Sequence, residues 1–123
     1  MKKINISITG ALGRMGKILI KKILSSKNLK LLSATDIKIK KIYKNIKTQK
    51  NSLNAFKKTD VIIDFSTPKS CLEILNYAKK LKKSVVIGTT GFSKKQNNII
   101  NNHSKKIPIF KSGNMSLGIN LLE

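Results

Sequence analysis

Acidic side chains are scarce in this sequence of 123 residues, which holds 5 Asp and Glu against 26 Lys and Arg and carries a formal net charge of +21. A charge of that size attracts phosphate groups without a specific site, so nucleic-acid binding has to be considered. Arg14 is the single arginine, however, and aromatic residues make up only 5% of the chain. The lysines are spread along every segment without stacking partners, which favours a solvated lysine surface over a nucleic-acid interface.

Cysteine and long apolar runs are also rare. Cys71 is the only cysteine, so no internal disulfide can form. A lone cysteine in a helical pattern is typical of a small buried residue, and we assign it no catalytic role. No apolar run approaches the roughly 20 residues of a membrane span, and the alternating start of the chain lacks the apolar core of a signal peptide. We expect a cytoplasmic protein with no membrane partner, and we assign no metal-binding residues.

What the sequence does contain is a regular alternation of strand and helix patterns, within a length that suits one domain. Ile4, Ile6 and Ile8 alternate with polar residues and predict a strand, and the apolar period from Met15 to Leu24 predicts a helix. Further strands are predicted at 30–35, 61–63, 84–87 and 108–110, further helices at 53–57, 68–81 and 93–103, and a loop at 37–51. This order predicts an α/β fold, a Rossmann-like parallel sheet with helices on both faces and ligands at the carboxyl ends of the strands.

Two helices carry start signals directly after predicted strands. The segment Ser66-Thr67-Pro68 supplies a capping hydroxyl and a proline suited to the first helical turn. Ser93 is the expected cap of the helix that runs to about His103.

A glycine-rich turn separates the first strand from the first helix and reads Gly10-Ala11-Leu12-Gly13-Arg14-Met15-Gly16. In a dinucleotide-binding turn, Gly10 permits the tight bend, Gly13 lets the backbone approach a pyrophosphate, and Gly16 allows close helix packing. The helix N-terminus then faces the phosphates, and Arg14 can add a charge-assisted contact. A glycine turn that only connects a strand to a helix would show the same pattern in isolation.

Asp36 lies 20 residues beyond Gly16, at the end of the second predicted strand. An acid at this place hydrogen-bonds the adenosine ribose in dinucleotide-binding domains, whereas the alternative is a solvated turn residue. The turn and the acid together favour a nicotinamide cofactor site. Lys38, Lys40 and Lys41 follow closely and can partly accept a 2′-phosphate, so the choice between NADH and NADPH stays open.

Two further segments fall at the ends of predicted strands, residues 64–68 and residues 88–92. Both are expected to line the same edge of the sheet, where their hydroxyls and glycines can contact the nicotinamide ribose and carboxamide. Each segment alone would also suit an ordinary strand-to-helix loop.

With the motifs GALGRMG, DFSTP, IGTTGF and KSGNMSLGIN in this order, the chain resembles the amino-terminal half of bacterial dihydrodipicolinate reductases over essentially its whole length. The resemblance implies a dinucleotide-binding domain at residues 1–115, with residues 116–123 starting a hinge into a missing substrate and tetramerisation domain. It implies hydride transfer from NADH or NADPH to the dicarboxylate 4-hydroxy-tetrahydrodipicolinate, in diaminopimelate and lysine biosynthesis. The family homotetramer forms through that missing domain.

Carried over position by position, the resemblance assigns cofactor contacts to four groups of residues. They are the turn Gly10, Ala11, Leu12, Gly13, Arg14 and Met15; the ribose acid Asp36; the segment Gly88, Thr89 and Thr90; and the segment Ser112, Gly113, Asn114 and Met115.

The catalytic pattern of the family, which includes paired histidines and a lysine, is expected beyond Glu123, so we assign no catalytic residue to this chain. His103 lies in a predicted helix and is interpreted as a surface histidine. We therefore expect a cofactor-binding part of a reductase that is inactive alone. The alternatives are a free-standing nicotinamide-nucleotide-binding module without turnover, and a basic nucleic-acid binder for which the sequence offers charge but no motif.

Overall fold

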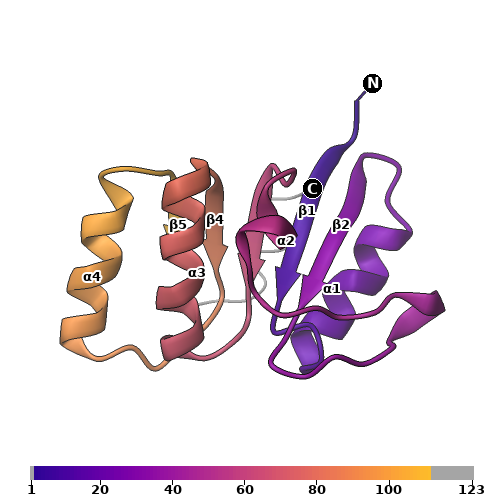
Figure 1. The fold of residues 1–123 in the computed structure, drawn as a ribbon, viewed down its shortest axis with the longest axis horizontal. Coiled ribbons are helices and arrows are strands. Elements are labelled where there is room, and N and C mark those ends of the chain that lie inside the picture. Colours follow the sequence, from indigo (N-terminus) through magenta and orange to yellow (C-terminus); the bar gives the residue numbers. More distant parts are fainter. Residues whose placement is uncertain (1, 112–123) are drawn as a thin grey trace.

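The computed structural model describes residues 2–111 and shows a five-stranded parallel sheet with helices on both faces, as the sequence predicts (Figure 1). The strands are β1 (Ile4–Thr9), β2 (Leu29–Thr35), β3 (Val61–Asp64), β4 (Ser84–Ile87) and β5 (Ile109–Lys111). The helices are α1 (Arg14–Leu24), α2 (Leu53–Phe56), α3 (Pro68–Leu81) and α4 (Lys94–Ser104), with a short 3-10 helix η1 (Tyr43–Asn45).

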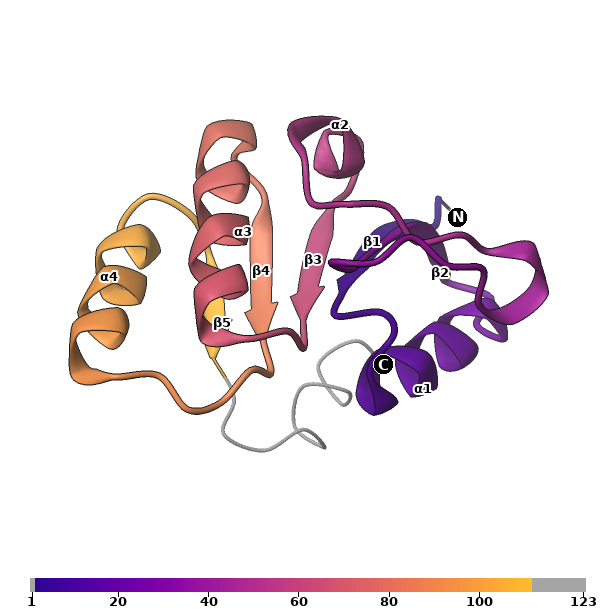
Figure 2. The ribbon, with the colours of Figure 1, turned by 60° about the horizontal axis from the view of Figure 1, so that its bottom comes forward.

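The strand order is β2-β1-β3-β4-β5, so the chain changes direction across the sheet between β1 and β3. It first moves outward from β1 through α1 to β2, and then returns to β3 on the other side of β1. Because parallel crossovers are right-handed, this reversal places α1 on one face and α3 and α4 on the other (Figure 2). The loops at the carboxyl ends of β1 and β3 diverge there, which is the position where open α/β sheets bind ligands.

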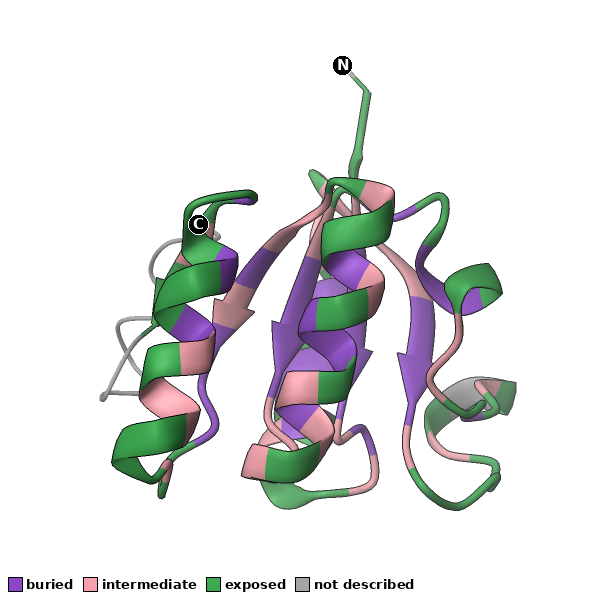
Figure 3. Ribbon diagram, turned by 60° about the vertical axis from the view of Figure 1, so that its left-hand side comes forward, coloured by how far each residue is buried: buried purple, intermediate pink, exposed green. Residues whose placement is uncertain are grey.

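Apolar residues on both sides of the strands allow helices to pack on both faces of the sheet. Ile6, Ile8 and Ile63 pack against α1, whereas Ile62 and Val85 pack against α3. β3 lies in the middle of the sheet and is buried on both faces, which is typical of a parallel sheet. Figure 3 shows that α3 and α4 turn their buried residues toward the sheet and their exposed residues outward.

Hydroxyl caps start the two helices that follow β3 and β4, and both were expected from the sequence. The Thr67 side chain accepts a hydrogen bond from Ser70 N at 3.2 Å, with Pro68 in the first turn of α3. Ser93 and Gln96 form a reciprocal capping box at the start of α4. The start of each helix is therefore fixed close to the carboxyl edge of the sheet.

The lysine-rich segment 37–51, predicted as a loop, is more structured than expected. It holds η1 and an isolated antiparallel bridge between Lys41 and Lys47. The buried Thr48 hydroxyl donates to Lys38 O at 2.7 Å and accepts from Lys40 N at 2.8 Å, which folds the segment back on itself. Gln49 then adds a one-residue parallel bridge beside Thr35 at the edge of the sheet. Hydrogen bonds of this kind leave no periodic signal in the sequence.

Two sequence-based expectations need correction. His103 is only 8% exposed and is therefore not a surface residue, because it lies one helical turn after Ile100 on the face of α4 that packs into the core. Burial, followed by the nearby Lys79, lowers the pKa of His103 below its ordinary value. The last strand begins at Ile109 and not at Pro108, whose nitrogen has no hydrogen to donate to a strand ladder.

Candidate functional site

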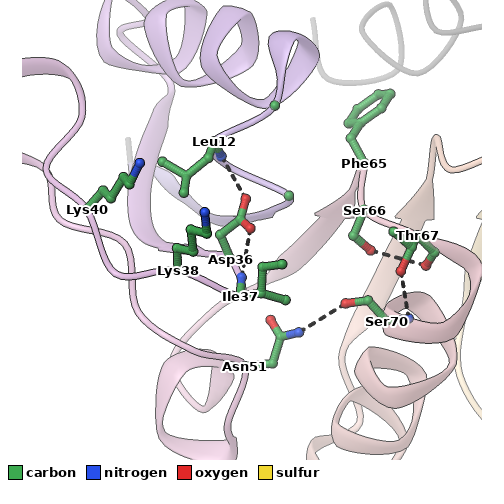
Figure 4. Close-up of a pocket in the computed structure, with 12 residues that line it drawn as sticks. Leu12, Asp36, Ile37, Lys38, Lys40, Asn51, Phe65, Ser66, Thr67 and Ser70 are labelled. Atoms are coloured by element: carbon green, nitrogen blue, oxygen red, sulfur yellow. Dashed lines mark hydrogen bonds between the residues drawn. The ribbon is translucent and has the colours of Figure 1, made fainter.

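A cleft of about 460 Å³ opens at the carboxyl edge of the sheet, beside the point where the loops after β1 and β3 diverge (Figure 4). It is lined by Gly10, Leu12, Gly13, Asp36, Ile37, Lys38, Lys40, Asn51, Phe65, Ser66, Thr67 and Ser70. A second hollow of about 440 Å³ shares Asp36, Asn51 and Ser70 with the first and extends to Lys50 and Glu73.

Two glycines of the β1–α1 turn are required by the fold itself. Gly10 has a φ of +69°, and a Cβ at this position would lie 2.2 Å from the Phe65 carbonyl oxygen. A Cβ at Gly16 would lie 2.4 Å from the Gly10 carbonyl oxygen, because α1 packs directly on the turn. A side chain at either position would force the backbone apart.

Gly13 is different, because the folded chain requires glycine there less strictly. Its φ of −75° and ψ of 169° are open to any residue, and a Cβ would meet only the Gly10 carbonyl oxygen at 3.3 Å. The space beside Gly13 belongs to the cleft. A position that needs no glycine for packing, but faces a cleft, is what the close approach of a ligand to the backbone requires.

The N-terminus of α1 begins at this same position. Gly13 is its N-cap and offers no side-chain cap, and the first turn contains no acidic residue. The N–H groups of a first helical turn lack intrahelical acceptors, so this terminus suits an anionic group. Arg14 is exposed in the first turn and adds positive charge beside it.

Asp36 lies beside the glycine turn, as Figure 4 shows. Its carboxylate accepts hydrogen bonds from Leu12 N at 2.9 Å and from Ile37 N at 2.7 Å. The acid therefore holds the turn in place as well as lining the cleft. Lys38 and Lys40 line the same cleft, whereas Lys41 lines a separate hollow on the outer side of α1.

The segments after β3 and β4 meet behind the cleft around a buried carboxylate. Asp64 accepts hydrogen bonds from Thr9 Oγ1 at 2.5 Å, from Thr89 Oγ1 at 2.8 Å and from Ser66 Oγ. Ser66 N donates to Thr89 Oγ1 at 2.9 Å. The segments 64–68 and 88–92 are thus brought together, as expected from the sequence, but by hydrogen bonds that the sequence does not reveal.

Cys71 lies close to this carboxylate and is fully buried, as predicted. Burial raises the pKa of the Cys71 thiol, and the charge and hydrogen bonding of Asp64 raise it further. A protonated, buried thiol is a poor nucleophile. Among residues 2–111, no cluster of His, Cys, Asp and Glu is placed to hold a metal ion.

Only some of the residues expected to contact a cofactor line the cleft. Gly10, Leu12, Gly13 and Asp36 line it. Ala11 is buried in the core beside α1, and Thr90 is exposed. Gly88 packs against the Phe65 ring, where a Cβ would lie 2.1 Å from a ring carbon.

Three more of the expected contact residues do not line the cleft, and four others are not described. Arg14 and Met15 lie in the first turn of α1, and Thr89 is buried behind the cleft. Ser112, Gly113, Asn114 and Met115 lie outside the described residues.

Asn51 and Ser70 are cleft residues that sequence reasoning missed. The Asn51 amide donates to Ser70 Oγ at 3.3 Å, and Thr35 Oγ1 donates to Asn51 Oδ1 at 2.5 Å. Asn51 reaches this place only because the segment 37–51 folds back to β2, and no local motif marks that return. The proline-started helix α3 was a usable signal for Ser70, which lies in its first turn.

Comparison with known proteins gives consistent matches. A family model described as "Dihydrodipicolinate reductase, N-terminus" matches residues 4–115. The 4-hydroxy-tetrahydrodipicolinate reductase of Pelagibacter ubique is 57% identical over 123 residues, which cover 99% of this chain and 48% of the relative. The reductase of the same name from Buchnera aphidicola (subsp. Cinara cedri) is 47% identical over 133 residues, covering 98% of this chain and 49% of the relative. The chain therefore spans about half the length of these curated relatives.

Solved structures share the fold. The dipicolinate-bound dihydrodipicolinate reductase from Paenisporosarcina sp. TG-14 matches with a TM-score of 0.75 at 22% identity, over 97% of this chain and 50% of that one. A homoserine dehydrogenase from S. aureus matches with a TM-score of 0.71 at 17% identity, over 91% of this chain and 33% of that one. At these identities the matches show a common architecture.

Proposed function

Because this chain belongs to the dihydrodipicolinate reductase family, we propose that it binds NADH or NADPH in the cleft beside the glycine turn and is the cofactor-binding part of a reductase acting on 4-hydroxy-tetrahydrodipicolinate. The observation that carries the proposal is the cleft beside Gly13, at the N-terminus of α1 that has no side-chain cap. The fold requires glycine less strictly there than at Gly10 or Gly16, whereas a pyrophosphate that approaches the backbone does require it.

The residues present fit the two phosphates and the adenosine of such a cofactor. The first-turn N–H groups of α1 would hold the pyrophosphate, with Arg14 adding charge. Asp36 would accept hydrogen bonds from the adenosine ribose. Its present bonds to Leu12 N and Ile37 N leave lone pairs free, because each carboxylate oxygen can accept more than one hydrogen bond.

The choice of cofactor depends on charges of opposite sign in one cleft. The Asp36 carboxylate repels a 2′-phosphate, whereas Lys38 and Lys40 in the same cleft attract it. We expect both cofactors to bind, with a preference for NADH.

The nicotinamide end of the cofactor would extend toward the segments after β3 and β4, where the Ser66 hydroxyl lines the cleft. By family resemblance, Ser112, Gly113, Asn114 and Met115 contribute to the same end. When bound, the cofactor supplies the hydride, and the protein residues orient it and keep it in place.

Turnover by the 123-residue chain alone is not expected. Hydride transfer needs the substrate held within about 3 to 3.5 Å of the nicotinamide, and general-acid assistance is typically worth about 10²- to 10⁴-fold. His103 cannot supply this assistance, because it is buried in the last turn of α4, which runs back from the carboxyl edge to the opposite edge of the sheet. By resemblance, the dicarboxylate substrate and the homotetramer contacts belong to the other half of the family enzyme.

Two measurements on the purified 123-residue chain test this proposal. Calorimetric titration with NADH and NADPH is expected to show binding of both, and the absence of binding by either would overturn the proposed cofactor site. A coupled assay with substrate generated in place is expected to show no substrate-dependent oxidation of NADH. Oxidation near the rate of a full-length family enzyme would contradict the proposed division between binding and turnover.

A further inference from the structure

One buried carboxylate connects the three central strands at the edge that forms the cleft. Asp64 is fully buried and lies in register with Thr9 of β1 and Ile87 of β4. Its side chain accepts from the hydroxyls of Thr9, Ser66 and Thr89, and also from Ser66 N at 3.2 Å. These donors belong to the segments that begin the loops after β1, β3 and β4.

This arrangement fixes the direction in which the surrounding hydroxyl groups point. The Ser66 and Thr89 hydroxyls both donate to the Asp64 side chain, so their hydrogens are directed at Asp64. Thr89 Oγ1 uses a lone pair to accept Ser66 N–H at 2.9 Å. The remaining lone pairs of these two oxygens are therefore oriented away from Asp64, and the Ser66 side chain lines the cleft.

We infer that Asp64 is a positioning residue for the nicotinamide half of the cofactor. It orients the Ser66 hydroxyl, which lines the cleft, to accept a hydrogen bond from the nicotinamide ribose or carboxamide, and it fixes the buried Thr89 hydroxyl that holds Ser66 N in place. The inference rests on the proposed function. Asp64 is buried behind these residues, so it acts through them and does not contact the cofactor.

The chemistry of an amide explains why the substitution Asp64→Asn probes this role. The Asn side chain is close in size to Asp, but one of its two polar atoms donates hydrogen bonds. A hydroxyl that faces this amide nitrogen has to turn its own hydrogen away from residue 64. The substitution thus reverses the hydrogen-bonding polarity of Ser66 or Thr89, while the glycine turn and Asp36, at the adenosine end, keep their own hydrogen bonds.

The experiment compares two ligands on three proteins by calorimetry. The ligands are NADH and ADP, which keeps the adenosine and two phosphates but lacks the nicotinamide and its ribose. The proteins are the 123-residue chain, Asp64→Asn and the control Asp60→Asn, an exposed acid just before β3 that accepts Asn5 N–H at 2.8 Å. Circular dichroism at the assay temperature checks that each protein is folded.

The expected result is a selective loss in Asp64→Asn. Its Kd for NADH should rise about tenfold, as for the loss of one hydrogen bond at a charged network. Its Kd for ADP should stay within about twofold of the unsubstituted chain, and Asp60→Asn should match that chain for both ligands. The fluorescence of bound NADH should also change in Asp64→Asn, because it reports the surroundings of the nicotinamide.

Other results overturn the inference in distinguishable ways. Equal weakening of both ligands, or no weakening of either, would show that Asp64 is only structural. An unsubstituted chain that binds neither ligand would overturn the proposed function, and this inference with it. If Asp64→Asn does not fold, Thr89→Val should show the selective loss of NADH binding. Thr89→Ser, which keeps the hydroxyl, should retain NADH binding. An unchanged ratio of NADH to ADP affinity in Thr89→Val would refute the positioning role.

Discussion

The two ends of the cleft differ in how their polar groups are satisfied. Around Gly13 and Asp36, backbone N–H groups, a carboxylate and two lysines face a hollow that a ligand can enter. Around Asp64, the polar groups are buried and bonded to one another. The polar groups at the first end are open to a ligand, whereas those at the second end are satisfied within the protein. Changes at the first end should therefore alter ligand binding, and changes in the buried framework should alter folding or ligand orientation.

The glycine turn contains a glycine that the fold requires, Gly10, and a glycine that lines the cleft, Gly13. Replacing each with alanine should give the largest difference in stability between the two kinds of position. Gly10→Ala should reduce the free energy of unfolding by roughly 2 to 4 kcal/mol, because the new Cβ would collide with the Phe65 carbonyl at a positive φ. Gly13→Ala should cost no more than about 1 kcal/mol, because its backbone suits any residue. Urea unfolding curves measure both, and equal losses would remove the distinction between the two glycines.

Cofactor choice should respond to Asp36. Asp36→Ala should weaken NADH binding, because the ribose loses its acceptor and Leu12 N loses the bond that holds the turn. The ratio of NADH to NADPH affinity should shift toward NADPH by about tenfold, because the charge that repels the 2′-phosphate is removed. Calorimetric titrations with both cofactors give this ratio. An unchanged ratio would show that Asp36 does not contact the adenosine ribose.

The lysines near Asp36 provide a matched control for that experiment. Lys40→Gln should weaken NADPH binding and leave NADH binding nearly unchanged, because Lys40 lines the cleft. Lys41→Gln should change neither affinity, because Lys41 lines a separate hollow. If the two variants behave alike, the positive charge acts through the general field of this basic chain and not at the cleft.

The contrast between the two ends also explains which features could be predicted from the sequence. The glycine turn, Asp36 and the caps Thr67 and Ser93 are local signals, because a few neighbouring residues determine their geometry. The parallel direction of the strands followed from the alternation of strand and helix patterns.

The remaining features depend on residues that are distant in the sequence. Asp64 bonds to hydroxyls 55 and 25 residues away along the chain, and Asn51 reaches the cleft through a folded-back segment. His103 is surrounded by polar residues in the sequence, so its burial became evident only from the packing of α4 on the sheet.

The smallest effect is expected at His103, in the last turn of α4. Burial lowers its pKa, so the folded state resists protonation while the unfolded state takes up a proton near the ordinary value of 6.5. Stability should therefore be greatest above pH 6.5 and should fall as the pH decreases from there through the folded-state pKa. His103→Gln should flatten this part of the stability profile. The profile is measured by urea unfolding between about pH 5 and 8, the range in which histidine titrates. The substitution should leave the NADH affinity at about pH 7.5 unchanged. An identical pH profile for both proteins would contradict this description of His103.

The central claim is that the pyrophosphate of a nicotinamide cofactor binds beside Gly13. The most direct test is calorimetric titration of NADH into the 123-residue chain and into Gly13→Val, with circular dichroism to confirm that the variant is folded. The valine side chain would occupy the space that the folded chain leaves open at the N-terminus of α1. We expect the unsubstituted chain to bind NADH and the folded variant to lose binding, whereas undiminished binding by Gly13→Val would place the cofactor elsewhere.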